Sequence, residues 1–307
     1  MLTNNITVYS PVDGLAIQGM IMKREDLEKY RALVVITHGM CEHKERYIPF
    51  MEFLCENGYI CVAYDQRGHG ATAPNHKELG YYGGKGKNAY LLAEDLHGVI
   101  TYAKSAYPEM PVYLFGHSMG TLVARLYFSK HSHSIYKLVL SGMPNYNGLA
   151  GIAKALVKFM KKKHGDAYRS DKVKQLSMGS FNKGNEVKNA WLSYNMENVE
   201  AYNADKLCGF TFTLDAFHNL FAMMEECYNV KGYQKINRDC AMLFIAGEDD
   251  PVIENQHNFL KTVSMYRRMG VRRIKQHLFP HMRHEILSED NKQEVYNMLL
   301  DFLMGNL

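Results

Sequence analysis

The fold is decided by Val112-Tyr-Leu-Phe-Gly116-His-Ser118-Met-Gly120, which runs directly into Thr121-Leu-Val-Ala-Arg-Leu-Tyr127. The apolar run before the glycine predicts a strand, and the apolar spacing after Gly120 predicts a helix. A serine between the two lies at the apex of a sharp strand-turn-helix connection, which is the context of a nucleophile elbow. Ser118 is therefore the first candidate nucleophile.

The residues around this serine fit the same interpretation. A tight turn holds the serine in a strained conformation, so Gly116 and Gly120 must be small for the strand and helix to pack closely. The turn also places the serine at a helix N-terminus, where backbone N–H groups lack partners. We therefore expect the Met119 amide to bind negative charge that develops on a reacting oxygen.

Composition limits the classes of protein to consider. The chain has 307 residues, of which 47% are apolar, enough for one large domain or two moderate ones. Lysine and arginine number 36 against 32 acidic residues, and no basic stripe with interleaved aromatics is visible, so we expect no nucleic-acid partner.

Cellular location and redox state are inferred from what the sequence lacks. The N-terminal residues show no secretory signal pattern, and no run of eighteen apolar residues could span a bilayer, so we expect a cytoplasmic location. The six cysteines have no C-x-x-C spacing, so we expect reduced, mostly buried thiols and no metal site.

Apolar runs predict eight strands. Two of them, on either side of Asp13-Gly14, suit an antiparallel sheet edge. The predicted strands are 6–10, 15–22, 32–37, 59–65, 112–116, 137–143, 240–246 and 274–279. Helices predicted at about 44–57, 88–105, 121–127, 255–269 and up to 304 separate the later strands, which is the pattern of a parallel sheet covered on both faces.

The alternation of strands and helices stops between residues 144 and 238, which we call the insertion. We expect it to be helical and to lie over the C-terminal edge of the sheet as a cap, on a core formed by residues 1–143 and 239–307. The segment from 71 to 87, rich in glycine and polar residues, is predicted to be a long surface connection.

Three predicted strand ends carry complementary chemistry. Ser118, an aspartate at 249 or 250, and a histidine at 281 or 284 each follow a strand, and sites in open parallel sheets form at that edge. A serine needs an imidazole to accept its proton, and an aspartate orients the imidazole and stabilises its charged form. The chain order Ser, Asp, His matches the order in hydrolases of this topology.

The whole chain resembles an α/β-hydrolase of the monoacylglycerol lipase, lysophospholipase and serine aminopeptidase-like group. The matching motifs are His38-Gly39-Met40-x-Glu42-His43 with Arg46-Tyr47, Asp65-x-Arg67-Gly68-His69-Gly70, Gly116-His-Ser118-Met-Gly120, Gly247-x-x-Asp250 and His284-Glu-Ile-Leu. In the insertion, Tyr202-Asn-Ala-Asp-Lys-Leu-Cys-Gly209-Phe resembles bacterial members.

The resemblance implies a mostly parallel eight-stranded sheet with a helical cap after the sixth strand. It implies that Asp250 is the acid, that His284 is the base, and that the Met40 amide joins Met119 in the oxyanion hole. It implies neither cofactor nor metal. His38, Asp65, Arg67 and His69 are expected to support loops, and Cys41 and Cys208 to be small buried side chains.

The insertion bears on the substrate. Its first helix could present one apolar face, flanked by lysines, that rests on an anionic lipid surface; alternatively this face packs on the core. The face comprises Leu149, Ile152, Ala153, Leu156, Val157 and Met160, and the lysines are 154, 158 and 161–163.

We therefore predict a serine hydrolase that cleaves acyl esters such as monoacylglycerols or lysophospholipids through an acyl-enzyme. The alternatives are a short-chain esterase, a serine aminopeptidase or a non-catalytic binding protein. An epoxide hydrolase or dehalogenase of the same fold is disfavoured because residue 118 is Ser rather than Asp.

Overall fold

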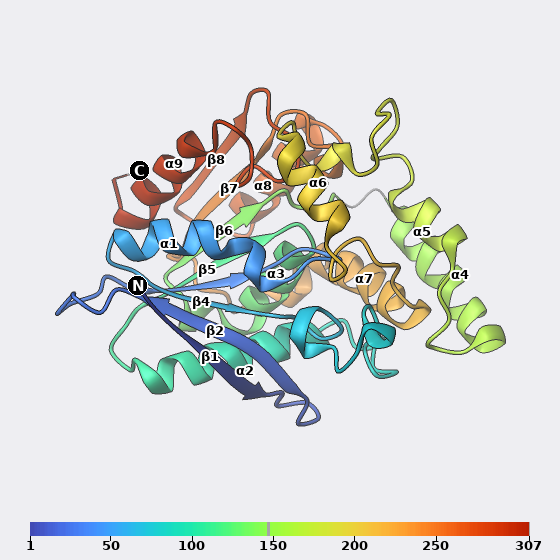
Figure 1. Cartoon of the computed structure of the whole chain (residues 1–307), viewed down its shortest axis with the longest axis horizontal. Helices are drawn as coiled ribbons and strands as arrows, with labels where there is room; N and C mark the ends of the chain where they lie inside the picture. Colours follow the sequence, from blue (N-terminus) through green and yellow to red (C-terminus); the bar gives the residue numbers. More distant parts are fainter. Residues whose placement is uncertain (146–147, 307) are drawn as a thin grey trace.

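A computed structural model describes residues 1–145 and 148–306 and leaves the Leu149 side chain undescribed. Its centre is a sheet of eight strands in the order β1-β2-β4-β3-β5-β6-β7-β8 (Figure 1). The strands are β1 (Leu2–Tyr9), β2 (Ala16–Lys23), β3 (Leu33–Thr37), β4 (Ile60–Tyr64), β5 (Val112–His117), β6 (Lys137–Ser141), β7 (Ala241–Gly247) and β8 (Ile274–Phe279). Only β1 with β2 and β2 with β4 pair antiparallel, so the predicted mostly parallel sheet is confirmed.

Helices cover both faces of the sheet, as expected for strands whose every residue is buried, such as β3, β4 and β7. One apolar cluster joins the sheet to α2 (Leu91–Ala106), α3 (Met119–His131) and α8 (Gln256–Arg268). The cluster on the other face joins it to α1 (Ile48–Glu56) and α9 (Lys292–Met304). The parallel strands therefore end together at one edge between two helical layers.

Two expectations about local structure need correction. Strand β1 begins at Leu2 rather than at residue 6. The polar residues before Ile6 also pair with β2, and this pairing extends to Leu2, which lies opposite Lys23. The segment 71–87 is not only a surface connection. Two short 3₁₀ turns belong to it: η2 (Gly70–Thr72), which begins one residue before the segment, and η3 (His76–Glu78). The segment also buries Tyr82 completely, and the Tyr82 ring lies 5.8 Å from that of Phe212.

The described part of the insertion is largely helical. It contains α4 (Leu149–His164), α5 (Asp171–Met178), η5 (Ala190–Leu192), α6 (Met196–Ala204), α7 (Leu214–Cys227) and η6 (Val230–Tyr233). Helix α7 packs against α3 of the core, and α4 packs against α7. Figure 1 shows α4 and α5 at the end of the molecule opposite the N-terminal strands. Residues 146 and 147 lie outside the described residues.

Helix α4 does not have the single apolar face that its sequence predicted. Its inner stripe, Ala150, Ala153, Val157 and Met160, packs on the core cluster. Its outer stripe, Ile152, Leu156 and Phe159, is 69%, 41% and 67% exposed. The expected face merged members of both stripes. Leu149 falls outside the described side chains.

Lys161 also departs from the prediction that it flanks a lipid-facing surface. Its side chain is buried, and its Nζ lies 2.7 Å from Asp215 Oδ1 and 3.0 Å from Asp166 Oδ1. Lys161 therefore holds the end of α4 against the start of α7. Within the described residues, none of the helices is both long and apolar enough to cross a membrane.

Candidate active site

Ser118 lies in a strained turn between β5 and α3. Its φ of 52° and ψ of −122° are unusual for a residue with a side chain. The conformation is held by its amide, which donates to the Ser141 carbonyl at 2.9 Å. A Cβ at position 120 would lie 2.3 Å from the Thr37 carbonyl oxygen, and one at 116 would lie 2.7 Å from that of Gly120. Both positions therefore require glycine.

His284 and Asp250 form a buried pair at the same edge of the sheet. Nδ1 of His284 lies 2.9 Å from Oδ2 of Asp250, whose other oxygen accepts the Val252 amide at 2.8 Å. Burial lowers the pKa of His284, but the charge and hydrogen bond of Asp250, with the charges of Glu285 and Glu42, outweigh it and raise the pKa above its ordinary value. His284 can thus gain a proton and keep it beside the carboxylate.

The alternative acid and base lie elsewhere. Asp249 and His281 are exposed, and Asp249 accepts a hydrogen bond from the Tyr194 hydroxyl at 3.1 Å. Neither of them lines the pocket that contains Ser118 and His284.

Gly142, just after β6, is a site residue that the sequence did not single out. It has a φ of 60°, and a Cβ there would come within 3.0 Å of the His284 ring and 3.2 Å of Asp250 Oδ2. The absence of a side chain leaves room for the pair. Sequence reasoning missed it because one glycine after a strand is an ordinary turn signal.

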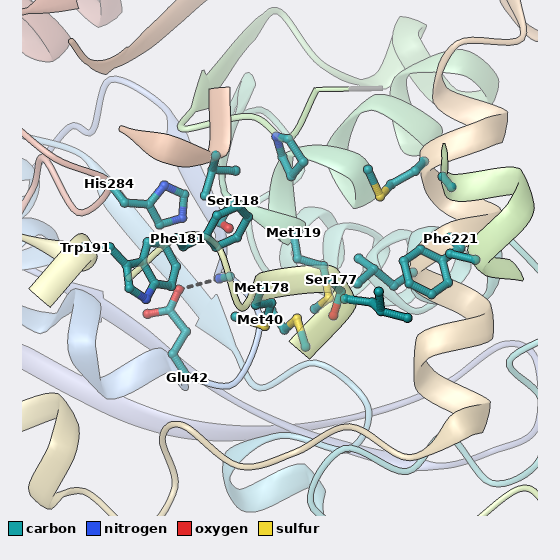
Figure 2. A pocket seen from close by; sticks show the side chains of 18 of the residues that line it. Met40, Glu42, Ser118, Met119, Ser177, Met178, Phe181, Trp191, Phe221 and His284 are labelled. Atoms are coloured by element: carbon teal, nitrogen blue, oxygen red, sulfur yellow. Dashed lines mark hydrogen bonds between the residues drawn. The ribbon is translucent and has the colours of Figure 1, made fainter. Parts of the chain in front are cut away.

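Met40 and Met119, whose amides are the expected oxyanion donors, both line the pocket that contains Ser118 (Figure 2). Met119 is the first residue of α3, so its amide has no partner within the helix. In the part of the chain that the structure describes, the Met40 amide donates no backbone hydrogen bond either. Gly39 lies so close to Ser118 that a Cβ on Gly39 would be 3.1 Å from Ser118 Cβ. The loop after β3 therefore lies against the elbow.

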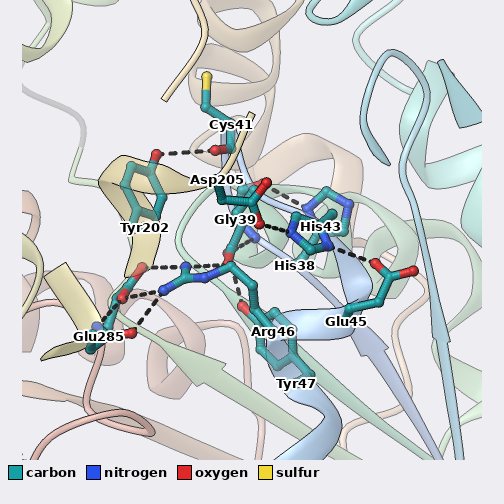
Figure 3. Close-up of polar contacts among 12 residues, drawn as sticks. His38, Gly39, Cys41, His43, Glu45, Arg46, Tyr47, Tyr202, Asp205 and Glu285 are labelled. Carbon is teal, nitrogen blue, oxygen red and sulfur yellow. Dashed lines mark hydrogen bonds and ion pairs between the residues drawn. The ribbon is translucent and has the colours of Figure 1, made fainter. Parts of the chain in front are cut away.

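A buried polar network supports this loop (Figure 3). Glu42 Oε1 accepts the Gly39 amide and the Tyr47 hydroxyl, and its Oε2 lies 2.9 Å from Arg46 Nη1. Arg46 also binds both carboxylate oxygens of Glu285, the neighbour of His284, at 2.6 and 2.7 Å. Burial raises the pKa of Glu42, but the charges of Arg46, His117 and His38 and the Gly39 amide outweigh it and lower the pKa to about 2. Arg46 thus joins the loops that carry Met40 and His284.

The remaining motif residues support loops, as expected. His69 Nε2 accepts the Cys41 amide at 3.2 Å, and His38 Nε2 accepts the Gln66 amide at 3.0 Å. Asp65 binds Lys44 Nζ at 2.7 Å, and Arg67 bridges Asp13 and Asp95. All six cysteines are free and buried, and neither Cys41 nor Cys208 lines the pocket.

The pocket above Ser118 is mostly apolar and encloses about 210 Å³. This exceeds the roughly 150 Å³ of a cavity that binds benzene inside a protein. The insertion supplies most of its wall, through Ala150, Ala153, Leu156, Val157, Val173, Leu176, Ser177, Met178, Phe181, Trp191, Leu192, Tyr202, Leu220, Phe221 and Met224. Figure 2 shows Phe181 and Trp191 beside the candidate catalytic side chains. Trp191, the only tryptophan in the sequence, has its ring 5.1 Å from that of His284.

A second cavity, of about 360 Å³, has a more polar lining. Glu42, His117 and Glu285 line both cavities, and Arg46, Asn195 and Asn198 line only the second. Burial and the charge of His284 lower the pKa of His117 to about 4. His117 is therefore neutral near neutral pH, and it borders both cavities.

Comparison with known proteins agrees with this architecture. A family model described as serine aminopeptidase, S33, matches residues 28–291. Monoacylglycerol lipase of Mycolicibacterium smegmatis is 29% identical over 127 residues, which are 41% of this chain and 42% of that protein. Monoglyceride lipase of Rattus norvegicus is 22% identical over 284 residues, which are 85% of this chain and 81% of that one.

Solved structures extend the likeness to the whole chain. A thermostable carboxyl esterase from Bacillus coagulans, solved in complex with glycerol, has a TM-score of 0.90 and 25% identity, with 99% of each chain covered. A variant of monoglyceride lipase from Saccharomyces cerevisiae, bound to a substrate analogue, has a TM-score of 0.74 and 20% identity, with 97% of this chain and 96% of that one covered. The second likeness concerns the fold alone.

Sheet order, elbow and overall likeness place this protein among the α/β-hydrolases. Within that class, the family match extends over most of the sequence, and the chain belongs to the serine aminopeptidase S33 family. The resemblance inferred from its motifs is thus confirmed.

Proposed function

We propose that this protein is a serine ester hydrolase whose substrate has a medium or long acyl chain and a small polar alcohol. Ser118 attacks the ester carbonyl, and His284 accepts its proton and returns it to the leaving alcohol. Asp250 orients His284 and stabilises the imidazolium. The Met40 and Met119 amides bind the oxyanion, and water then releases the acyl group from Ser118.

The lining of the pocket carries this proposal. Side chains of the insertion enclose an apolar space that begins at Ser118 and is suited to a hydrocarbon chain. Each buried methylene contributes about 0.8 kcal/mol, so a longer acyl chain gains affinity while it stays within the pocket. In this proposal the insertion acts as a cap that holds the acyl chain.

The second, more polar cavity supports the proposal that the leaving alcohol carries additional hydroxyl groups. Glu42, His117 and Glu285 border both spaces, so an ester carbonyl at Ser118 would have its alcohol beside hydrogen-bonding groups. The lipase relatives and the glycerol bound to the similar esterase agree with a glycerol-like alcohol.

Glu42 and Glu285 also raise a second possibility, that two carboxylates bind the free amino group of an aminopeptidase substrate. Arg46 argues against it, because its guanidinium already pairs with both carboxylates. A second cation would have to displace this buried partner. We therefore favour an uncharged polar alcohol over an amine.

The test is hydrolysis of p-nitrophenyl esters from acetate to palmitate, together with monoacylglycerols and aminoacyl anilides. Wild type should prefer acyl chains of about eight carbons or longer, and Ser118→Ala should lose on the order of 10⁴-fold or more in kcat. A preference for acetate would favour the short-chain esterase, and a preference for the anilides would favour the aminopeptidase. Ester hydrolysis that survives in Ser118→Ala would overturn the mechanism.

A further inference from the structure

Outside the catalytic pocket, the fold brings together three side chains of the kinds that bind transition metals. They are His43, in the loop after β3, and Asp205 and Cys208, in the loop after α6. One ring nitrogen, one carboxylate oxygen and the sulfur lie within 4.8 Å of one another. Nε2 of His43 is 2.7 Å from Oδ2 of Asp205, although 162 positions separate the two residues. No sequence spacing could have indicated this group.

The sulfur of Cys208 differs from the other cysteine sulfurs. Those of Cys41, Cys55, Cys61, Cys227 and Cys240 each lie within hydrogen-bond distance of a backbone carbonyl oxygen. Among the hydrogen bonds of the described residues, none involves the Cys208 sulfur, although the residue is only 9% exposed. A buried sulfur without a hydrogen bond beside a histidine and a carboxylate is an arrangement that a metal ion would satisfy.

The second nitrogen of His43 has the partner that a metal-binding histidine needs. Nδ1 lies 2.6 Å from Glu45 Oε2 (Figure 3). The other oxygen of Glu45 lies 2.6 Å from Lys44 Nζ. A carboxylate on the far nitrogen fixes the ring and keeps a proton on Nδ1, so that Nε2 presents a lone pair to a metal once the proton that it shares with Asp205 has left. The Asp205 side chain is 33% exposed, which gives an ion access from solvent.

We propose that His43, Asp205 and Cys208 form a binding site for a borderline-soft divalent metal ion of the zinc class. Nε2, one carboxylate oxygen and the thiolate supply three ligands, and water takes the fourth position of a tetrahedral site. The thiol proton and the proton shared by His43 and Asp205 leave to solvent. Thiolate and carboxylate together then balance the charge of the ion.

The site joins the insertion to the loop that carries Met40. The Cys41 carbonyl accepts the Tyr202 hydroxyl and the Gly209 amide, both at 3.0 Å, so residues on either side of the proposed ligands already contact this loop. An ion there would add a strong link between the two segments. We expect it to raise the melting temperature of the protein, and this effect does not depend on ester hydrolysis.

The experiment titrates the full, untagged and reduced protein with Co²⁺ and Zn²⁺, using Cys208→Ala, Asp205→Asn and, as a matched control, Cys240→Ala. Wild type and the control should bind one equivalent of Co²⁺ with a sulfur-to-cobalt charge-transfer band, and Zn²⁺ should displace it and raise the melting temperature. Cys208→Ala should lose the band, and Asp205→Asn should weaken binding. Glu45→Gln should lower the affinity by roughly 10–100-fold.

Two results would overturn the site: no saturable binding of one equivalent by wild type, or an unchanged thiolate band in Cys208→Ala. Should Cys208→Ala fail to fold, the partly exposed Asp205→Asn decides, because undiminished Co²⁺ affinity there contradicts the site. Both readouts are independent of catalysis, so failure of the metal site and failure of the esterase proposal remain distinguishable.

Discussion

The two walls of the pocket are built in opposite ways. The sheet-edge wall consists of the loops that carry Gly39, Ser118, Asp250 and His284. Short hydrogen bonds and ion pairs hold it together, and its glycines leave no room for a methyl group. The insertion wall is apolar, and its outer helices keep large side chains such as Leu176 74% exposed. Under the proposed function, this difference assigns the chemistry to the sheet edge and the choice of substrate to the insertion.

The largest expected effect tests the sheet-edge wall. Asp250→Asn should lower kcat by about 10⁴-fold, because an amide neither stabilises the imidazolium nor keeps the correct tautomer. The loss should be the same for short and long acyl chains. Asp249→Asn and His281→Gln serve as controls and should stay within about twofold of wild type, because single surface changes usually have small effects. Equal losses in these controls would contradict the assignment of acid and base.

The pH profile of wild type follows from the same pair. His284 must be neutral to accept the serine proton, so kcat/KM should fall as pH drops through its pKa. Asp250 raises this pKa, so the fall should begin above the ordinary histidine value of about 6.5. In Asp250→Asn the residual activity should decline at lower pH than in wild type. An unchanged midpoint would show that another group titrates.

The next effect tests the insertion wall. Ala153 lines the pocket from α4, so Ala153→Trp should fill space that an acyl chain would occupy. If four methylenes are excluded, the loss is about 3 kcal/mol, or roughly 100-fold in kcat/KM for long esters, with acetate hydrolysis unchanged. Ala155→Trp is the control, because Ala155 is exposed on the same helix and does not line the pocket. An equal loss for acetate and palmitate esters would contradict the proposed division of roles between the sheet edge and the insertion.

The two walls also differ in how far the sequence revealed them. The sheet edge was predictable, because an apolar strand, a sharp turn and a following helix are local signals, and strand ends meet at one edge. The candidate residues at 118, 250 and 284 followed from order and motif. Lys161 and Trp191 did not, because burial of a lysine by Asp215 and placement of a tryptophan against His284 depend on contacts between distant segments.

Substitution of Glu42, in the sheet-edge wall, should lower kcat by a smaller factor. Glu42→Gln keeps an acceptor for the Gly39 amide but loses the charge that pairs with Arg46. Removal of an oxyanion donor costs about 10²–10³ in kcat, so looser support of the Met40 loop should cost less, about tenfold. A positioning role predicts a lower kcat with little change in KM at every acyl length. A change confined to KM would instead indicate that Glu42 binds the substrate alcohol.

The smallest effect concerns the outer stripe of α4. Ile152 and Phe159 are largely exposed beside Lys158 and Lys162, an arrangement that suits an anionic lipid surface. Asp at both positions should weaken binding to anionic vesicles several-fold and slow the hydrolysis of vesicle-bound monoacylglycerol, while hydrolysis of dissolved p-nitrophenyl butyrate stays unchanged. Ala155→Asp, with one added charge on the same helix, should weaken vesicle binding much less. Equal weakening by this control would mean that charge alone governs the contact and that the apolar stripe does not enter the lipid.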